Sequence, residues 1–227
     1  MALPRRLPLA FFVALLALLM AAAPVMAGSA VVVRHGLRET KIVALTFDDC
    51  WSAKRTAEIV SILEQRGVTA TFFPYSQVVK ASPDLWRYIA RRFPIANHTI
   101  SHPHLTWLSG SEILREIDGA RRQVETVTGQ PMVRALRPPY GSYDSRVLRK
   151  AYDAGFHYVV LWDVDSGDTA RLSDSRVRYL ASSGRKGSIV LMHGGPAVTP
   201  RVLSDVISNY KARGFRFVTV AEMIGLR

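Results

Sequence analysis

The sequence contains a single cysteine, Cys50, and therefore cannot form an intramolecular disulfide. The stability of the protein must therefore come from a packed core rather than from disulfides. Buried lone cysteines are more often inert packing residues than metal ligands, so we do not expect Cys50 to coordinate a metal. Internal repeats and low-complexity segments are also lacking, which favours one compact domain.

Long hydrophobic runs are confined to the N-terminus. Residues 1–6 carry Arg5 and Arg6, and residues 7–23 form an apolar run that small residues follow. This is the pattern of an export signal, with cleavage predicted after Ala27. The alternative is an uncleaved membrane anchor, because about 17 apolar residues lie near the lower limit for a bilayer span. We expect an exported protein that is extracellular, periplasmic or in the cell wall.

Acidic residues are scarce, with 18 Asp and Glu against 30 Lys and Arg, and the net charge is +12. Loss of residues 1–27 would remove two arginines and no acids, which lowers +12 to +10. Such a charge suits association with an anionic cell wall or membrane surface. The basic residues occur in scattered pairs, without interleaved aromatics or a recognisable nucleic-acid motif. We therefore expect no nucleic-acid partner.

Strand-like and helix-like segments alternate along residues 41–227, after the predicted signal at 1–27 and a short lead segment at 28–40. The predicted strands are 41–47, 68–73, 94–97, 132–136, 157–162, 188–192 and 215–220, and the predicted helices are 53–66, 82–92, 111–127, 145–154, 175–182 and 199–213. This alternation implies a parallel sheet with crossover helices. About seven βα units are too few for an eightfold barrel. The expected fold is α/β, a distorted and incomplete (β/α)7-type barrel.

Polar clusters follow five of the predicted strands. They are Asp48–Asp49, His98 with His102, Arg137–Gly141, Asp163 with Asp165, and His193. The carboxyl ends of parallel strands share one face, and catalytic groups gather there. A carboxylate and two imidazoles are the ligand set of a catalytic zinc-type ion that keeps one position open. A second carboxylate is left over to take a proton from water.

Five segments in order resemble the motifs of the polysaccharide deacetylases, the family 4 carbohydrate esterases that carry a NodB homology domain. The segments are Thr46–Asp49, His98–His102, Arg137–Gly141, Asp163–Ser166 and Leu191–His193. Each motif alone is weak, whereas all five in this order are specific. The resemblance extends over about residues 41–223 and implies the NodB homology fold.

The resemblance also implies a bound divalent metal, with Zn²⁺ expected and Co²⁺ or Ni²⁺ as alternatives. Its ligands would be Asp49, His98 and His102. Asp48 would be the general base, with Arg137 as its charge partner. The physics agrees, because two adjacent carboxylates can divide labour, one binding the metal while the other stays free.

The remaining roles come from the later motifs. His193 is implied as the general acid, oriented by Asp165, and histidine is suited to give a proton to a leaving nitrogen near neutrality. Tyr140 would donate its backbone N–H to the oxyanion. Leu191 would form a wall of the acetyl pocket, and we expect Pro138 to help bind the substrate.

The sequence departs from the family pattern at two places. Cys50 and Trp51 stand where Gly-Pro usually follows the aspartate pair, and Thr169 stands where a tryptophan often lines the acyl pocket. We hypothesise that Trp51 supplies a stacking surface for a sugar ring. Three further histidines match no motif and are given no role: His35, His104 and His157.

The expected function is therefore hydrolysis of N-acetyl groups on N-acetylglucosamine units of a glycan, such as peptidoglycan, a chitin-like oligomer or an exopolysaccharide. We expect the protein to act as a monomer. One alternative is an O-acetyl esterase acting on xylan-type sugars, since the same groups would serve either leaving atom. The other is a non-catalytic protein that binds the cell wall.

Overall fold

A computed structural model describes residues 28–226. The predicted export signal, residues 1–27, lies outside these residues. Within the described part, no helix is long and apolar enough to cross a membrane.

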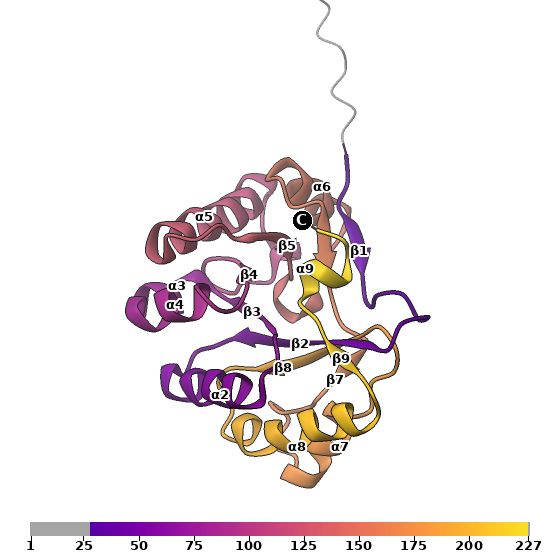
Figure 1. Ribbon diagram of the computed structural model, residues 1–227. Coiled ribbons are helices and arrows are strands. Elements are labelled where there is room, and N and C mark those ends of the chain that lie inside the picture. The colour runs from indigo at the N-terminus through magenta and orange to yellow at the C-terminus, as the bar shows by residue number, and fades with distance from the viewer. Residues whose placement is uncertain (1–27, 227) are drawn as a thin grey trace, which may run out of the picture.

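The chain alternates short parallel strands with helices that wrap around them (Figure 1). The strands are β1 (Val31–Val33), β2 (Ile42–Asp49), β3 (Thr71–Pro74), β4 (Ala96–Asn97), β5 (Val133–Leu136), β6 (Tyr158–Val160), β7 (Val164–Asp165), β8 (Ser188–His193) and β9 (Arg216–Phe217). The α-helices are α2 (Ala53–Arg66), α3 (Ser76–Ala81), α4 (Pro83–Ala90), α5 (Gly110–Thr128), α6 (Ser145–Asp153), α7 (Asp174–Ala181), α8 (Val198–Ala212) and α9 (Val220–Met223), and two 3₁₀ turns are η1 (Leu105–Trp107) and η2 (Pro139–Gly141).

The strands form two sheets, with order β1-β6-β5-β4 in one and β3-β2-β8-β7 in the other, and β9 pairs with the start of β2. All of these strand pairings are parallel. Isolated bridges between Phe72 and Ile95 and between His35 and Ser188 connect the regions of the two sheets. The expected α/β fold, a distorted and incomplete barrel, is confirmed.

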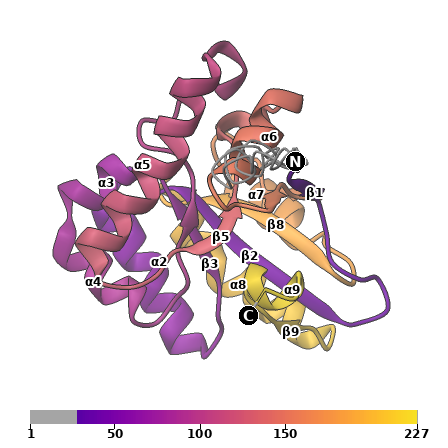
Figure 2. The same cartoon turned by 90° about the horizontal axis from the view of Figure 1, so that it is seen from above.

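Helices cover the outside of the strands (Figures 1 and 2). Helix α2 packs on α8, α8 on α7, and α5 on α3, α4 and α6. Helices α2 and α5 have clear local signals at their ends. In α2 the Ser52 hydroxyl caps the N-terminus, and Gly67, at φ 59°, ends the helix in the left-handed region. In α5, Ser109 and Glu112 form a capping box.

The core lies between the strands and this helical layer. Strand β2 is buried on both faces along its centre, as expected for a parallel strand covered on both sides. Phe72 of β3 lies at the centre of an aromatic cluster. Its ring centroid is 5.4 Å from that of Phe47, 6.3 Å from Trp86 and 5.6 Å from Phe93. A core of this size stabilises the fold without any disulfide.

Most sequence-predicted elements are confirmed, several within one or two residues of the predicted bounds. The pattern missed four short elements, which are β1, α3, β7 and α9. Strand β1 falls within the lead segment, 28–40, and pairs residue by residue with β6. This lead segment is therefore part of the folded domain. Three residues carry too little periodicity to separate a strand from a loop.

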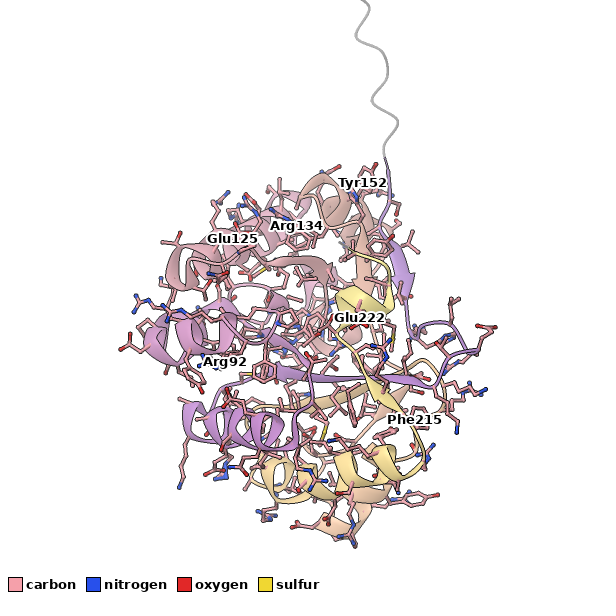
Figure 3. The ribbon with its side chains drawn as sticks, viewed as in Figure 1. Arg92, Glu125, Arg134, Tyr152, Phe215 and Glu222 are labelled. Atoms are coloured by element: carbon pink, nitrogen blue, oxygen red, sulfur yellow. The ribbon has the colours of Figure 1, made fainter. Side chains whose placement is uncertain are left out.

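Many basic residues on the surface are paired with carboxylates. Arg92, just after α4, and Arg134, in β5, are both exposed (Figure 3). Arg92 pairs with Glu64 at 2.9 Å, and Arg134 with Glu125 at 3.7 Å. Exposed pairs of this kind contribute little stability, about 0–1 kcal/mol each.

Candidate active site

The carboxyl ends of several strands meet around one cavity of about 340 Å³. Strand β2 ends with Asp48 and Asp49, and Asp48 stands in register with His193 at the end of β8. His98 follows β4, and the N–H of Arg137 after β5 donates to the Asn97 carbonyl at 2.9 Å. The cavity is lined by Asp48, Asp49, His98, His102, Tyr140, Trp162, Asp165, Thr169, Leu191 and His193.

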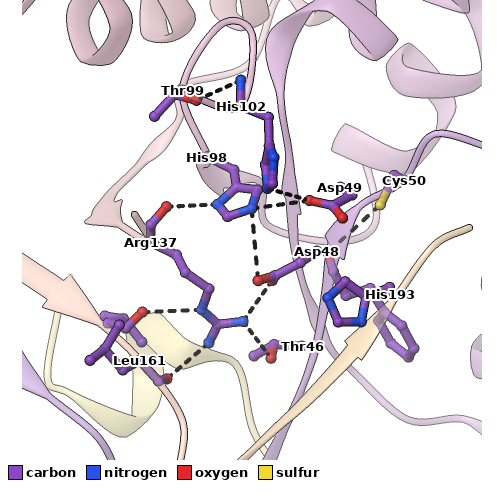
Figure 4. Close-up of polar contacts among 12 residues, drawn as sticks. Thr46, Asp48, Asp49, Cys50, His98, Thr99, His102, Arg137, Leu161 and His193 are labelled. Atoms are coloured by element: carbon purple, nitrogen blue, oxygen red, sulfur yellow. Dashed lines mark hydrogen bonds and ion pairs between the residues drawn. The ribbon is translucent and has the colours of Figure 1, made fainter. Parts of the chain in front are cut away.

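Asp49, His98 and His102 form a cluster whose ligand atoms all lie within 4.8 Å of one another (Figure 4). Asp49 Oδ1 is 3.2 Å from His98 Nε2 and 3.0 Å from His102 Nε2. Burial raises the pKa of Asp49, but the hydrogen bonds and positive charge of the two histidines outweigh burial and hold it well below its usual range. The carboxylate is therefore ionised, as metal binding requires.

The donors in this cluster suit a divalent ion. His98 Nδ1 lies 2.6 Å from the Arg137 carbonyl, which can only accept, so Nδ1 carries a proton and Nε2 is the nitrogen left to face an ion. Two ligand atoms bound about 2.1 Å from one tetrahedral zinc would be about 3.4 Å apart. The observed separations of 3.0 and 3.2 Å are close to that value. Asp49, His98 and His102 thus fit a metal with an open position.

The backbone at this cluster is held in an unusual conformation. Asp49 and His102 have φ values of 61° and 62°, in the left-handed region. Each such non-glycine residue costs on the order of 1–3 kcal/mol, which the surrounding fold must offset. Residues of this kind gather at functional sites because the conformation aims a side chain that regular structure would direct elsewhere.

Asp48 lies beside the cluster and is held by a buried arginine (Figure 4). Arg137 Nη1 donates to Asp48 Oδ1 at 2.6 Å, and both side chains are almost fully buried. The same guanidinium donates to the Thr46 hydroxyl at 2.8 Å and to the carbonyls of Val160 and Leu161 at 3.1 and 3.0 Å. Burial lowers the pKa of Arg137, and the charge of Asp48 opposes that change. Every nitrogen of the guanidinium therefore donates a hydrogen bond, which helps to offset the cost of burying the charge.

His193 lines the same cavity (Figure 4). It lies on the side of Asp48 that faces away from His98 and His102. Its Nδ1 lies 2.8 Å from Asp168 Oδ1, and its backbone N–H donates to Asp168 Oδ2 at 2.8 Å. Asp168 Oδ2 also accepts from the Thr199 hydroxyl at 2.7 Å. Burial lowers the pKa of His193, but the hydrogen bond and charge of Asp168, with the charges of Asp48 and Asp49, raise it to about 9.

This arrangement can perform acid–base hydrolysis. One cavity brings together a candidate metal-binding triad, a second carboxylate and a histidine whose pKa is raised. Opposed groups of this kind can take a proton on one side of a substrate and give one on the other.

Sequence comparison identifies the family. The family model described as "Polysaccharide deacetylase" matches residues 35–159. A chitooligosaccharide deacetylase from Rhizobium leguminosarum bv. trifolii is 34% identical over 186 residues, which cover 81% of this chain and 83% of that protein. This chain belongs to the polysaccharide deacetylase family.

Other polysaccharide deacetylase family members are similarly close. A peptidoglycan-N-acetylglucosamine deacetylase from Bacillus cereus is 30% identical and covers 81% of this chain and 88% of its own length. A solved structure from Bacillus anthracis, described as a pseudoenzyme of carbohydrate esterase family 4, has a TM-score of 0.82 at 28% identity. The match covers 87% of this chain and 70% of that one. The fold is therefore shared by members that differ in activity.

One residue expected from the family pattern is misassigned. Asp165 lines the cavity but is exposed, and its carboxylate accepts from the Gly167 N–H at 2.9 Å. Asp168, not Asp165, holds His193. Strand β7 ends at Asp165, and the chain turns through Gly167 at φ 67° before Asp168 is directed back toward β8. Strand and helix periodicity do not record such a turn, so the sequence could not show that Asp168 contacts His193.

The expected substrate residues are only partly brought to the cavity. Leu191 lines it, whereas Pro138 is buried and is not among the lining residues. Trp51 is 48% exposed and flanks the cavity, with its ring 6.4 Å from that of His193. A Cβ on Gly195 would collide with the Trp51 ring, so this glycine allows the indole to lie flat against the backbone.

The sequence did not predict the parts that Thr199 and Trp162 play in the site. Thr199 anchors Asp168 from α8, and Trp162 lines the cavity. The Trp162 ring lies within 3.0 Å of the place a Cβ would take on Gly141. An aromatic wall is therefore present although Thr169 stands where the family often has tryptophan. Cys50 is buried and outside the metal cluster, and burial with the charges of Asp49 and Asp48 raises the pKa of its thiol.

Proposed function

We propose that this protein is a metal-dependent deacetylase that hydrolyses N-acetyl groups on N-acetylglucosamine units of a glycan. One observation carries the proposal: a single cavity places the metal-binding triad and Asp48 opposite His193. The relatives named above act on chitooligosaccharides and on peptidoglycan. They support the same class of substrate here, whether peptidoglycan, a chitin-like oligomer or an exopolysaccharide.

Asp49, His98 and His102 would hold the ion, which we propose to be Zn²⁺. When bound, such an ion acts as a Lewis acid toward a carbonyl oxygen and lowers the pKa of water. The hydrogen bond from His98 Nδ1 to the Arg137 carbonyl fixes the imidazole that faces the ion. The metal cluster and the Asp48–Arg137 pair are thereby coupled through one residue.

Asp48 would take the proton from the attacking water. Three fixed acceptors hold the Arg137 guanidinium besides Asp48 itself, so the carboxylate is held in place and keeps its charge balanced. His193 would donate a proton to the leaving nitrogen from Nε2, since Asp168 occupies Nδ1. Amide cleavage needs this proton because an unprotonated amine anion is a very poor leaving group.

The acetyl group would lie between these residues. Leu191 and Trp162 supply apolar surface at the cavity wall, which suits a methyl group. Tyr140 would donate its backbone N–H to the developing oxyanion. Its φ of 60° turns this peptide away from regular helix geometry.

Acetate release tests the proposal directly. The protein is incubated with zinc and, separately, with chelator on peptidoglycan, chitin oligomers and acetyl-xylan. We expect acetate to be released from the N-acetyl glycans, and we expect chelator to abolish this release. The variants His98→Ala, Asp48→Asn and His193→Ala should each lose it, with circular dichroism confirming that they fold. Activity retained in Asp48→Asn would overturn the assignment of the base.

Two other outcomes of the same assay would change the proposed function. Faster release from acetyl-xylan than from any N-acetyl glycan would indicate an O-acetyl esterase. The likeness to a pseudoenzyme of the family makes the non-catalytic alternative concrete. Glycan binding without acetate release, in protein that contains no stoichiometric metal, would support that alternative.

We also propose that the protein is exported and acts as a monomer near an anionic surface. The N-terminal pattern supports export. The 30 basic residues, against 18 acidic ones, support association with an anionic surface. Cell fractionation with N-terminal sequencing tests export and cleavage after Ala27. A full-length protein retained in the membrane would indicate the uncleaved anchor, and light scattering would test the monomer.

A further inference from the structure

An exposed stack of three aromatic rings extends from the rim of the cavity. His104 lies between Trp107 and Tyr140, with ring centroids 4.0 and 3.9 Å apart and interplanar angles of 28° and 13°. Tyr140 in turn lies 4.7 Å from His102, one of the metal-binding residues. Tyr140 and His102 both line the cavity. The stack is therefore continuous with the site described above.

The outer end of the stack is open to solvent. Trp107 is 79% exposed and Tyr140 60% exposed. Exposed single apolar side chains are common, but an ordered row of them beside a cavity has the character of a recognition surface. The family motifs leave His104 and Trp107 without a function.

The segment that carries Trp107 is firmly held. Leu105 at the start of η1 is completely buried, and the Trp107 N–H donates to the His104 carbonyl at 3.0 Å. Arg146 of α6 donates to the carbonyls of Thr106 and Leu108 at 2.8 and 3.0 Å. The indole is thus presented by a fixed backbone, which lowers the entropy lost when a ligand binds it.

We propose that the Trp107–His104–Tyr140 stack is a glycan subsite that binds sugar units beyond the one held in the cavity. The inference rests on the proposed function and extends it to a preference for chains over single sugars. A pyranose ring presents faces of C–H groups, which pack on aromatic faces and exclude water. His104 separates Trp107 from Tyr140, with centroid distances of 4.0 and 3.9 Å. A sugar unit confined to the cavity therefore does not contact Trp107.

The aromatic composition of the stack suits neutral sugars. Two of its rings are indole and phenol, and the stack contains no acidic side chain. Polymeric glycans of N-acetylglucosamine offer such neutral rings in succession. The other reading is that the stack only positions Tyr140, whose φ of 60° needs support. The two readings differ in whether chain length matters.

Kinetics on N-acetylglucosamine oligomers of different length separate them. For Trp107→Ala, we expect kcat/KM on a pentasaccharide to fall about fivefold to tenfold through KM, with little change on a disaccharide. Trp107→Phe should retain most of the activity on the pentasaccharide. Tyr179→Ala is the matched control. Tyr179 is 65% exposed on α7 and is not among the residues that line the active-site cavity. An equal loss on both oligomers, or a loss in kcat alone, would overturn the subsite.

Binding measurements keep this test separate from the proposed function. Calorimetry with the pentasaccharide compares His193→Ala with the double variant that also carries Trp107→Ala. A drop in affinity on removing Trp107 supports the subsite even if no substrate ever releases acetate, an outcome that would overturn only the deacetylase proposal. Equal affinities in the two proteins refute the subsite.

Discussion

Replacing Asp168 with asparagine removes the charge that keeps His193 protonated. Asp168 accepts three hydrogen bonds, from the His193 ring, the His193 N–H and the Thr199 hydroxyl. Asparagine keeps the size of the side chain but offers only one oxygen, so an N–H₂ group must face one of these donors. In either orientation the imidazolium loses its compensating charge.

The size of the effect follows from the His193 pKa. Asp168, assisted by Asp48 and Asp49, raises this pKa from 6.5 to about 9 against the opposing effect of burial. That difference corresponds to about 3 kcal/mol. Without Asp168, burial still lowers the pKa while the charges of Asp48 and Asp49 still raise it, so we expect the pKa to fall from about 9 toward its ordinary value of 6.5. With a pKa near 6.5, about a tenth of the variant would carry the catalytic proton at pH 7.5, whereas nearly all of the native protein would.

The assay is the pH dependence of kcat/KM for acetate release. A general acid must be protonated, so activity falls as pH rises through its pKa. The native basic limb should lie near 9, or below 9 once a cation neutralises Asp48 and Asp49. Asp168→Asn should move it toward 6.5, with a loss of up to about tenfold at pH 7.5 that narrows toward pH 5.5. Asp165→Asn, the control, should leave the limb in place.

Two results would refute this reasoning. One is an unchanged basic limb in Asp168→Asn, and the other is a shift in Asp165→Asn instead. Stability offers an independent check. Because the folded pKa of His193 lies above its ordinary value, the interaction stabilises the fold fully below pH 6.5 and is lost as pH rises through about 9. The difference in unfolding free energy between native protein and Asp168→Asn should therefore shrink from pH 6 to pH 9.

Three further predictions concern other parts of the site. Arg137→Met leaves Asp48 buried without a partner and should lower the free energy of unfolding by about 3–5 kcal/mol; a denaturant titration showing less than 1 kcal/mol would contradict this. Zinc at about 100 times its dissociation constant should stabilise the native protein by about 2.7 kcal/mol, and in His98→Ala the melting temperature should not respond. Trp51→Ala should raise KM for chitooligosaccharides, and an unchanged KM would refute its stacking role.

The sequence alone was enough to predict the class of fold and most of the polar residues that the structure gathers around the cavity. Helices α2 and α5 are long, periodic and capped, so local physics determines them. The candidate metal ligands lie directly after strands, and parallel strands bring their carboxyl ends to one face. The cluster of Asp49, His98 and His102 follows from this rule. The register of β2 against β8 then places Asp48 beside His193.

Only the tertiary structure decided which aspartate holds His193 and which aromatic residues border the cavity. Asp165 and Asp168 are both close to the strand end in sequence, and the choice between them depends on a turn at Gly167 and an anchor from α8. The stack on His104 joins η1 to η2, 36 residues apart between His104 and Tyr140. Strand periodicity and helix caps are local, so they are legible in a sequence. Contacts between loops depend on how the whole chain packs, and no local pattern records them.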